Sequence, residues 1–151
     1  MTSTTESGAV QALLDRAEII DVCVRYATAL DSRQWDLLAT CFEPDASVEY
    51  AGFDPLTGVE GVVATCRAAL EPLDASQHLL GNHVVTVDGD EARSQCYLQA
   101  QHVRSGTPGG DNYIIAGTYT DELRRGTDGW KIARRRLTVT WTSGNPTVLA
   151  R

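Results

Sequence analysis

Residues 76–90 read Ser-Gln-His-Leu-Leu-Gly-Asn-His-Val-Val-Thr-Val-Asp-Gly-Asp. The β-branched run followed by the Asp-Gly-Asp turn predicts a strand that leads into a hairpin, with His78 near its start. Because side chains alternate between the two faces of a strand, a regular strand places His78 and Asn82 on one face and His83 on the other. We therefore expect His83 to be structural, and a β-bulge at Gly81 would overturn that assignment.

Three more strands are predicted downstream. In Glu91–Val103 the even-numbered positions are small or apolar and the odd-numbered ones mostly polar, so the even face is expected to point inward, and it ends at His102. Tyr113–Arg124 and Trp130–Trp141 are predicted as the next two strands. In the last strand we expect Arg135 to pair with carboxylates at the surface, although an inward face would make it a pocket or interface cation.

The first half of the chain has helical spacing instead. Residues Val10–Leu30 carry one apolar row, and four residues beyond its end lies Asp31, which would then face the core or a pocket. Alternatively, Asp31 or Ser32 caps the short helix expected over Gln34–Phe42. A second amphipathic helix is predicted over Val59–Leu70. The apolar row consists of Leu13, Ala17, Ile20, Val24 and Ala27.

Helices that precede a run of long strands indicate an α+β domain, with helices on one face of a curved antiparallel sheet. The 151 residues fit one domain. We expect this domain to span residues 10–145, with a disordered tail over residues 1–9 and a C-terminal tail over residues 146–151.

Composition excludes several classes of function. The net charge of −7 argues against a nucleic-acid partner, and no stretch is apolar enough to span a membrane. The polar residues 1–8 lack the pattern of a secretion signal, so we expect a cytoplasmic protein. The four cysteines have no CxxC spacing, which favours buried free thiols over a zinc site.

Short motifs along most of the chain resemble one known family. They are Arg25–Asp31, Cys41–Ala46, Gln77-His78 with Asn82, Asp88–Ala92, Gly117–Tyr119 and Asp128–Ile132. Together they resemble the SnoaL-like branch of the nuclear-transport-factor-two-like superfamily. The resemblance implies a curved sheet wrapped around the N-terminal helices to form a cone with an internal pocket. Enzymes of this branch include scytalone dehydratase, dehydrochlorinases and polyketide cyclases, and the resemblance implies that this chain is related to them.

The resemblance implies roles for individual residues. Dehydratase and dehydrochlorinase members use a His–Asp pair, to which His78 and Asp31 are similar in position. His102 resembles a second histidine of scytalone dehydratase, and Tyr26 and Tyr50 resemble its pocket tyrosines.

These residue types suit acid–base chemistry. Histidine titrates near neutral pH and can act as a general base, and a carboxylate on its far nitrogen fixes the tautomer. A phenol such as Tyr50 can stabilise an enolate, and Asn82 is a further candidate for binding substrate. Each has a structural alternative: His78 bonded to a backbone carbonyl, His102 at a solvated strand end, the two tyrosines as core packing, and Asn82 as a buried amide.

We thus expect an acid–base enzyme that needs no metal or organic cofactor. A lyase of the dehydratase type, acting on a small hydrophobic cyclic or polyketide-like molecule, is expected first. An isomerase or cyclase would use the same residues, and a non-catalytic binding or scaffold subunit is the alternative of another class. The resemblance also implies a homodimer or homotrimer.

Overall fold

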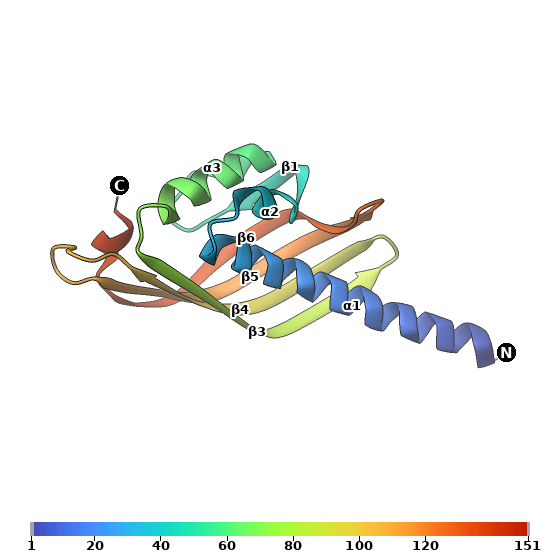
Figure 1. Cartoon of the computed structure of the whole chain (residues 1–151). Coiled ribbons are helices and arrows are strands. Elements are labelled where there is room, and N and C mark those ends of the chain that lie inside the picture. Colours follow the sequence, from blue (N-terminus) through green and yellow to red (C-terminus); the bar gives the residue numbers. More distant parts are fainter. Residues whose placement is uncertain (1, 151) are drawn as a thin grey trace.

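The computed structural model describes residues 2–150, and in it three helices cover one face of a curved six-stranded sheet (Figure 1). The order of the helices and strands confirms the predicted α+β class. The elements in chain order are α1 (Thr2–Asp31), α2 (Trp35–Ala39), β1 (Phe42–Glu49), β2 (Leu56–Thr57), α3 (Val59–Leu70), β3 (Ala75–Asp88), β4 (Glu91–Val103), β5 (Asn112–Gly126), β6 (Gly129–Gly144) and the 3-10 helix η1 (Pro146–Leu149).

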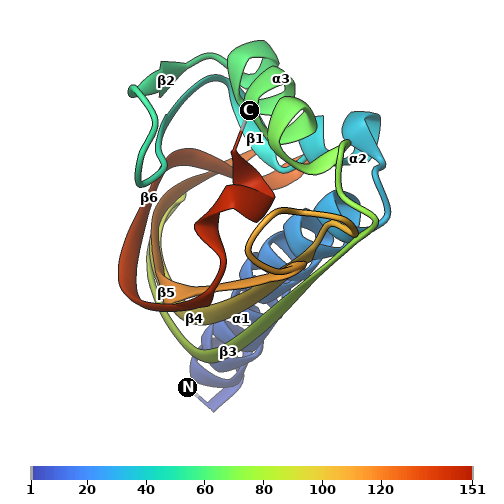
Figure 2. The same cartoon turned by 90° about the vertical axis from the view of Figure 1, so that its left-hand side faces the viewer.

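The strands lie in the order β2-β1-β6-β5-β4-β3. Hairpins connect β3 to β4, β4 to β5 and β5 to β6, so these pairs are antiparallel as predicted. One pair departs from the prediction: β1 runs parallel to β6, and α3 and four further strands lie between them in the chain. Seen end-on, the sheet curls around α1, with η1 and α3 above its open end (Figure 2).

Helix α1 packs a different row of side chains than predicted. The buried row is Ile19, Val22, Tyr26 and Leu30, whereas Leu13 and Val24 of the predicted row are exposed. Both rows have the spacing of an amphipathic face, so periodicity could not choose between them. Tyr26, which is not a member of the predicted apolar row, is 1% exposed and lies in the core.

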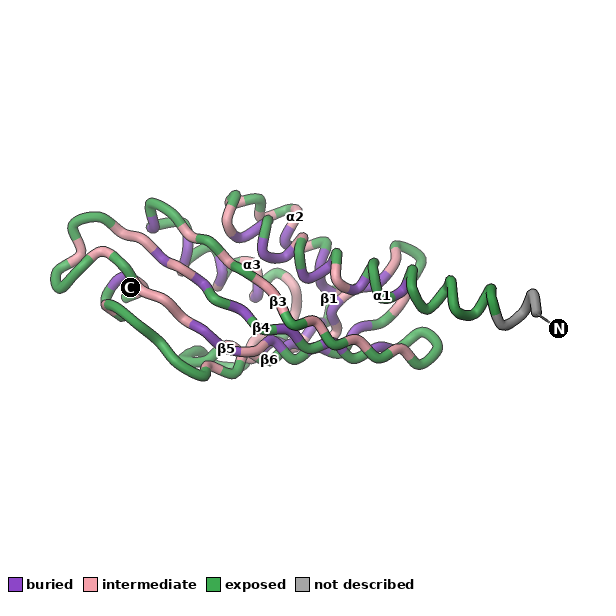
Figure 3. The backbone as a smooth tube through the Cα atoms, turned by 90° about the horizontal axis from the view of Figure 1, so that it is seen from below, coloured by how far each residue is buried: buried purple, intermediate pink, exposed green. Residues whose placement is uncertain are grey.

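Helical segments occupy both of the stretches that were expected to be tails. Helix α1 begins at Thr2, and its exposed residues 6–14 project beyond the sheet (Figure 3). At the other end, residues 146–149 form η1, in which Val148 is buried against the core. Met1 and Arg151 lie outside the described residues. Among the described residues, no helix is both long and apolar enough to cross a membrane.

Candidate active site

A cavity of about 800 Å³ lies between the concave face of the sheet and the helices. Its walls come from the C-terminal end of α1, from α3 and from strands β3 to β6. Residues 51–54 and η1 line it as well. Most lining side chains are aliphatic or aromatic, and a cavity of this size suits a small organic molecule.

His78 and Asp31 meet in the wall of this cavity. The Nδ1 atom of His78 lies 2.7 Å from Oδ1 of Asp31, and the backbone N–H of His78 donates to Oδ2 at 2.8 Å. Ser76, two residues earlier on the same face of β3, donates from Oγ to Oδ1 at 3.0 Å. The predicted pair therefore forms, and Asp31 does not cap the following helix, whose first turn has no side-chain cap.

The environment of Asp31 favours its charged form. Burial acts to raise the pKa of Asp31, but the hydrogen bonds from the ring and backbone of His78 outweigh it and lower that pKa. An ionised Asp31 can only accept hydrogen bonds, so Nδ1 of His78 carries a proton. The opposite nitrogen, Nε2, is then the acceptor in the neutral ring and the atom able to take a proton from a bound molecule.

His102 stands beside this pair. Its side chain is buried, lines the cavity and meets the ring of His78 edge-on at 5.8 Å between centroids. Nδ1 of His102 donates to the carbonyl oxygen of Tyr113 at 3.2 Å, which leaves its Nε2 as an acceptor. Burial, with the nearby His78, lowers the pKa of His102 to about 4, so the ring is neutral at neutral pH.

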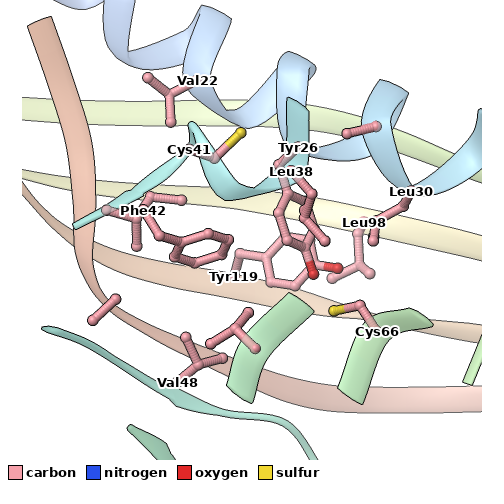
Figure 4. Close-up of a cluster of buried hydrophobic side chains, with 14 of the residues drawn as sticks. Val22, Tyr26, Leu30, Leu38, Cys41, Phe42, Val48, Cys66, Leu98 and Tyr119 are labelled. Carbon is pink, nitrogen blue, oxygen red and sulfur yellow. The ribbon is translucent and has the colours of Figure 1, made fainter. Parts of the chain in front are cut away.

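Three tyrosines form a second polar group in the cavity. The hydroxyls of Tyr26 and Tyr50 lie 2.7 Å apart, and Cys66 donates from Sγ to the Tyr50 hydroxyl at 3.6 Å. Tyr119 joins them, with its ring edge-on to Tyr26 (Figure 4). Burial raises the pKa of each of the three phenols, so they remain protonated donors. Sequence reasoning missed Tyr119, although it lies on β5 within the Gly117–Tyr119 motif.

A buried cation packs against the rings of two of these tyrosines. The Arg135 guanidinium lies 4.2 Å from the ring centre of Tyr26 and 4.1 Å from that of Tyr119. Its Nε and Nη2 atoms each donate to Asp121 at 2.7 Å, and both side chains of this pair are essentially unexposed. The expectation of a surface ion pair is wrong, because Arg135 points inward on β6. It is not among the cavity-lining residues.

Asn82 and His83 depart from the predicted alternation. Asn82 and His83 together stand opposite Cys96, which makes a β-bulge, and Asn82 has a positive φ of 53°. The bulge exposes Asn82 to solvent, outside the cavity, so its assignment as a substrate-binding residue is wrong. His83 turns to the inner face but lies away from the cavity, and its carbonyl accepts a hydrogen bond from Arg16. The Gly-Asn pair at residues 81–82 was the signal in the sequence that could have predicted this bulge.

Among the described residues, no group of three or more His, Cys, Asp or Glu side chains is placed to hold a metal ion. The polar side chains that line the cavity are instead two imidazoles, four phenols, the Asp54 carboxylate and the side chains of Thr65 and Cys66, and the Asp31 carboxylate contacts one of the imidazoles, that of His78. Such a set can move protons and bind oxygen atoms of an otherwise apolar molecule.

Comparison with known proteins yields one family and several relatives. Residues 11–136 match the SnoaL-like domain family. An uncharacterized protein of Mycobacterium tuberculosis (strain H37Rv) is 34% identical over 131 residues, covering 83% of this chain and 86% of that protein.

Two solved structures from Novosphingobium aromaticivorans are also similar. One, provisionally named an aromatic ring hydroxylase, is 27% identical with a TM-score of 0.82, and the alignment covers 91% of this chain and 97% of that one. The other, provisionally named a scytalone dehydratase, is 25% identical with a TM-score of 0.80 and coverage of 96% and 92%.

Proposed function

The chain belongs to the SnoaL-like family, as its motifs predicted, and on that basis we propose that it is a lyase of the dehydratase type that uses no cofactor. The observation that carries the proposal is the 2.7 Å contact between His78 and Asp31 in the wall of an apolar cavity. A similar solved protein that is provisionally named a dehydratase supports the same class of reaction.

In the proposed reaction His78 Nε2 removes a proton from carbon next to a carbonyl group. The C–H bond breaks, its electron pair moves toward the carbonyl, and the Tyr50 hydroxyl donates to the oxygen on which charge develops. Asp31 stabilises the imidazolium that forms. The electron pair then returns to make a C=C bond as the neighbouring C–O bond breaks, and the departing hydroxide takes the proton from His78 and leaves as water.

His102 is a poor candidate for the acid that protonates the departing hydroxide. With its pKa lowered to about 4, His102 holds almost no proton to give at neutral pH. We therefore assign it as the acceptor for a hydroxyl of the substrate. The imidazolium of His78 is then the acid for the leaving group, so one histidine acts first as base and then as acid.

The lining suggests the class of substrate. Among residues 2–150, no Lys or Arg lines the cavity, and Asp54 is the one acidic residue in its lining. A neutral, hydrophobic cyclic or polyketide-like molecule with a carbonyl oxygen fits this lining. An isomerase or cyclase would begin with the same proton abstraction and differ only where the proton returns.

The test is a screen of cyclic β-hydroxy ketones, followed by ultraviolet absorbance of the conjugated product. Replacing His78 by Ala should lower turnover on the order of 10²–10⁴-fold, the range of a general base. His83→Ala is the matched control, because His83 lies off the cavity. Turnover of His78→Ala close to that of the control would remove the base from the mechanism.

A non-catalytic scaffold or binding subunit is the second candidate. The fold alone permits it, because one fold can carry unrelated functions. A scaffold has no need of an open cavity with convergent polar groups, whereas an enzyme does. Binding of hydrophobic ketones without any turnover across the screen would favour this second candidate.

We also propose a cytoplasmic homodimer or homotrimer. Leu79 and Tyr97, on neighbouring strands, are 60% and 56% exposed on the face of the sheet away from the helices. Four free cysteines suit a reducing compartment. Light scattering after size-exclusion chromatography tests the assembly, and Tyr97→Lys should lower the mass to that of one chain if this face is the interface. An unchanged mass would remove this face from the proposal.

A further inference from the structure

Arg33 ends helix α1 in a conformation that arginine rarely adopts. Its φ is 59°, and among the described residues only Arg33 and Asn82 are non-glycine residues with positive φ. The N–H of Arg33 donates to the carbonyl of Leu30, and that of Gln34 to the carbonyl of Ala29. This is the Schellman arrangement, in which the position held by Arg33 is usually glycine. Helix termination therefore does not explain an arginine here.

The side chain of Arg33 explains it better. The guanidinium folds back so that Nη1 donates to the Leu30 carbonyl at 2.6 Å and to Oγ of Ser76 at 2.8 Å. Ser76 in turn donates to Oδ1 of Asp31 at 3.0 Å, the same oxygen that lies 2.7 Å from Nδ1 of His78. Arg33 is thus linked to the His78 ring through two intervening side chains.

The chemistry of these groups gives the chain of hydrogen bonds one direction. A guanidinium can donate but never accept, so Ser76 must accept from Arg33 and has its single proton left for Asp31. Asp31 then accepts from both Ser76 and His78. As a result Nδ1 of His78 is the donor, and the unprotonated nitrogen of the neutral ring is Nε2.

We infer that Arg33 is a positioning residue that holds the Ser76 hydroxyl on Asp31 and thereby keeps the carboxylate in place against Nδ1 of His78. The strained backbone of Arg33 brings its guanidinium within reach of Ser76, whereas a glycine would end the helix equally well and leave Ser76 free to turn. Strain held at such a point is a common mark of a functional site. The role depends on the proposed function of His78 only in its effect on turnover.

The first variant separates this role from folding. Arg33→Gly suits the positive φ and removes only the guanidinium, so we expect the melting temperature to hold or rise. We expect turnover to fall roughly 10–100-fold, about what a hydrogen bond to a charged group contributes. Arg33→Lys keeps a cationic donor and should recover part of the loss.

A spectroscopic measurement reports on the tautomer without any substrate. In proton–nitrogen NMR of the imidazoles at neutral pH, His78 of the unaltered protein should show a protonated Nδ1 and an unprotonated Nε2. His83→Gln and His102→Gln assign the signals. Arg33→Gly should keep this tautomer, because Asp31 remains an acceptor, but the Nδ1 proton of His78 should exchange faster with water.

Ser76→Ala supplies an independent check, because it interrupts the same chain one step later. Its effect and that of Arg33→Gly should not add in the double variant, since either change alone breaks the connection. Fully additive losses would overturn the inference, and so would an Arg33→Gly protein with an unchanged exchange rate of the Nδ1 proton and turnover within twofold. Faster exchange of the Nδ1 proton in a protein that converts no substrate would instead uphold the positioning role and count against the proposed lyase.

Discussion

Replacing Asp31 by Asn tests the candidate site and its stability together. The carboxylate accepts three hydrogen bonds, two at Oδ1 and one at Oδ2. An asparagine side chain keeps the shape but has only one oxygen. In either orientation of the amide, an NH₂ group must then face a donor from His78.

The magnitude follows from that mismatch. If the NH₂ group faces the backbone N–H, a buried donor loses its partner, which costs about 1–3 kcal/mol of unfolding free energy. For a protein of this size the melting temperature should fall by roughly 2–12 °C. If the NH₂ group faces the ring instead, Nδ1 must become the acceptor and Nε2 the donor, so His78 can no longer accept a proton.

Two assays measure the two effects. Turnover should fall by about 10²–10⁴-fold, comparable to the loss of the base itself. Thermal melts at several pH values should show the stability difference above about pH 4, because the pKa of Asp31 is lowered below its ordinary 3.8 in the folded protein. The difference should shrink as the pH falls further and the native carboxylate takes up a proton.

Asp45→Asn is the matched control, because Asp45 lies exposed on β1. It should match the unaltered protein in both assays. An Asp31→Asn protein with turnover within threefold of that control would refute the assignment of Asp31 as the group that orients His78.

Three further outcomes follow from the structure. His102 takes up a proton near pH 6.5 in the unfolded chain but only near pH 4 in the folded protein, so the free energy of unfolding should decrease as the pH is lowered from 6.5 to 4. Denaturant titrations of His102→Gln should show a weaker dependence on pH over this range. Asp121→Ala should cost about 3–5 kcal/mol in denaturant titrations by leaving Arg135 buried and unpaired, whereas the double change Asp121→Leu with Arg135→Met should recover most of it, and equal losses would contradict this. Gly117→Ala should lower the melting temperature, because a Cβ at this position would lie 2.1 Å from the backbone oxygen of Thr138, and a melt like that of the parent would mean that β6 shifts freely.

Local patterns predicted the elements well. The helix over Val59–Leu70 and the strand over Glu91–Val103 have the observed bounds, because each has one apolar face that alternates at its own period. Spacing also led toward Asp31, although through the wrong row of α1. Which of two apolar faces a helix buries depends on the sheet it meets, and the sequence of the helix does not contain that information.

The pairing within the site was harder to predict. The roles of His78, Asp31 and His102 came from resemblance, since 47 residues separate the two members of the pair. Asn82 was misplaced because strict alternation was carried across a bulge. Arg135 was placed at the surface and Tyr119 was missed, because a buried cation between two aromatic rings requires three elements to meet, and no single segment shows such a meeting.

The bulge at residues 81–84 also bears on how this fold can change over time. It reverses the parity of β3, so the segment with Ser76 and His78 and the segment from His83 to Asp88 present opposite sets of positions inward. Since β4 keeps its even-numbered positions inward along its whole length, deleting one residue at the bulge would restore regular alternation and leave both segments facing as they do now. Related sequences can therefore gain or lose this one residue without turning either half of the strand over, and the half that carries His78 stays as it is.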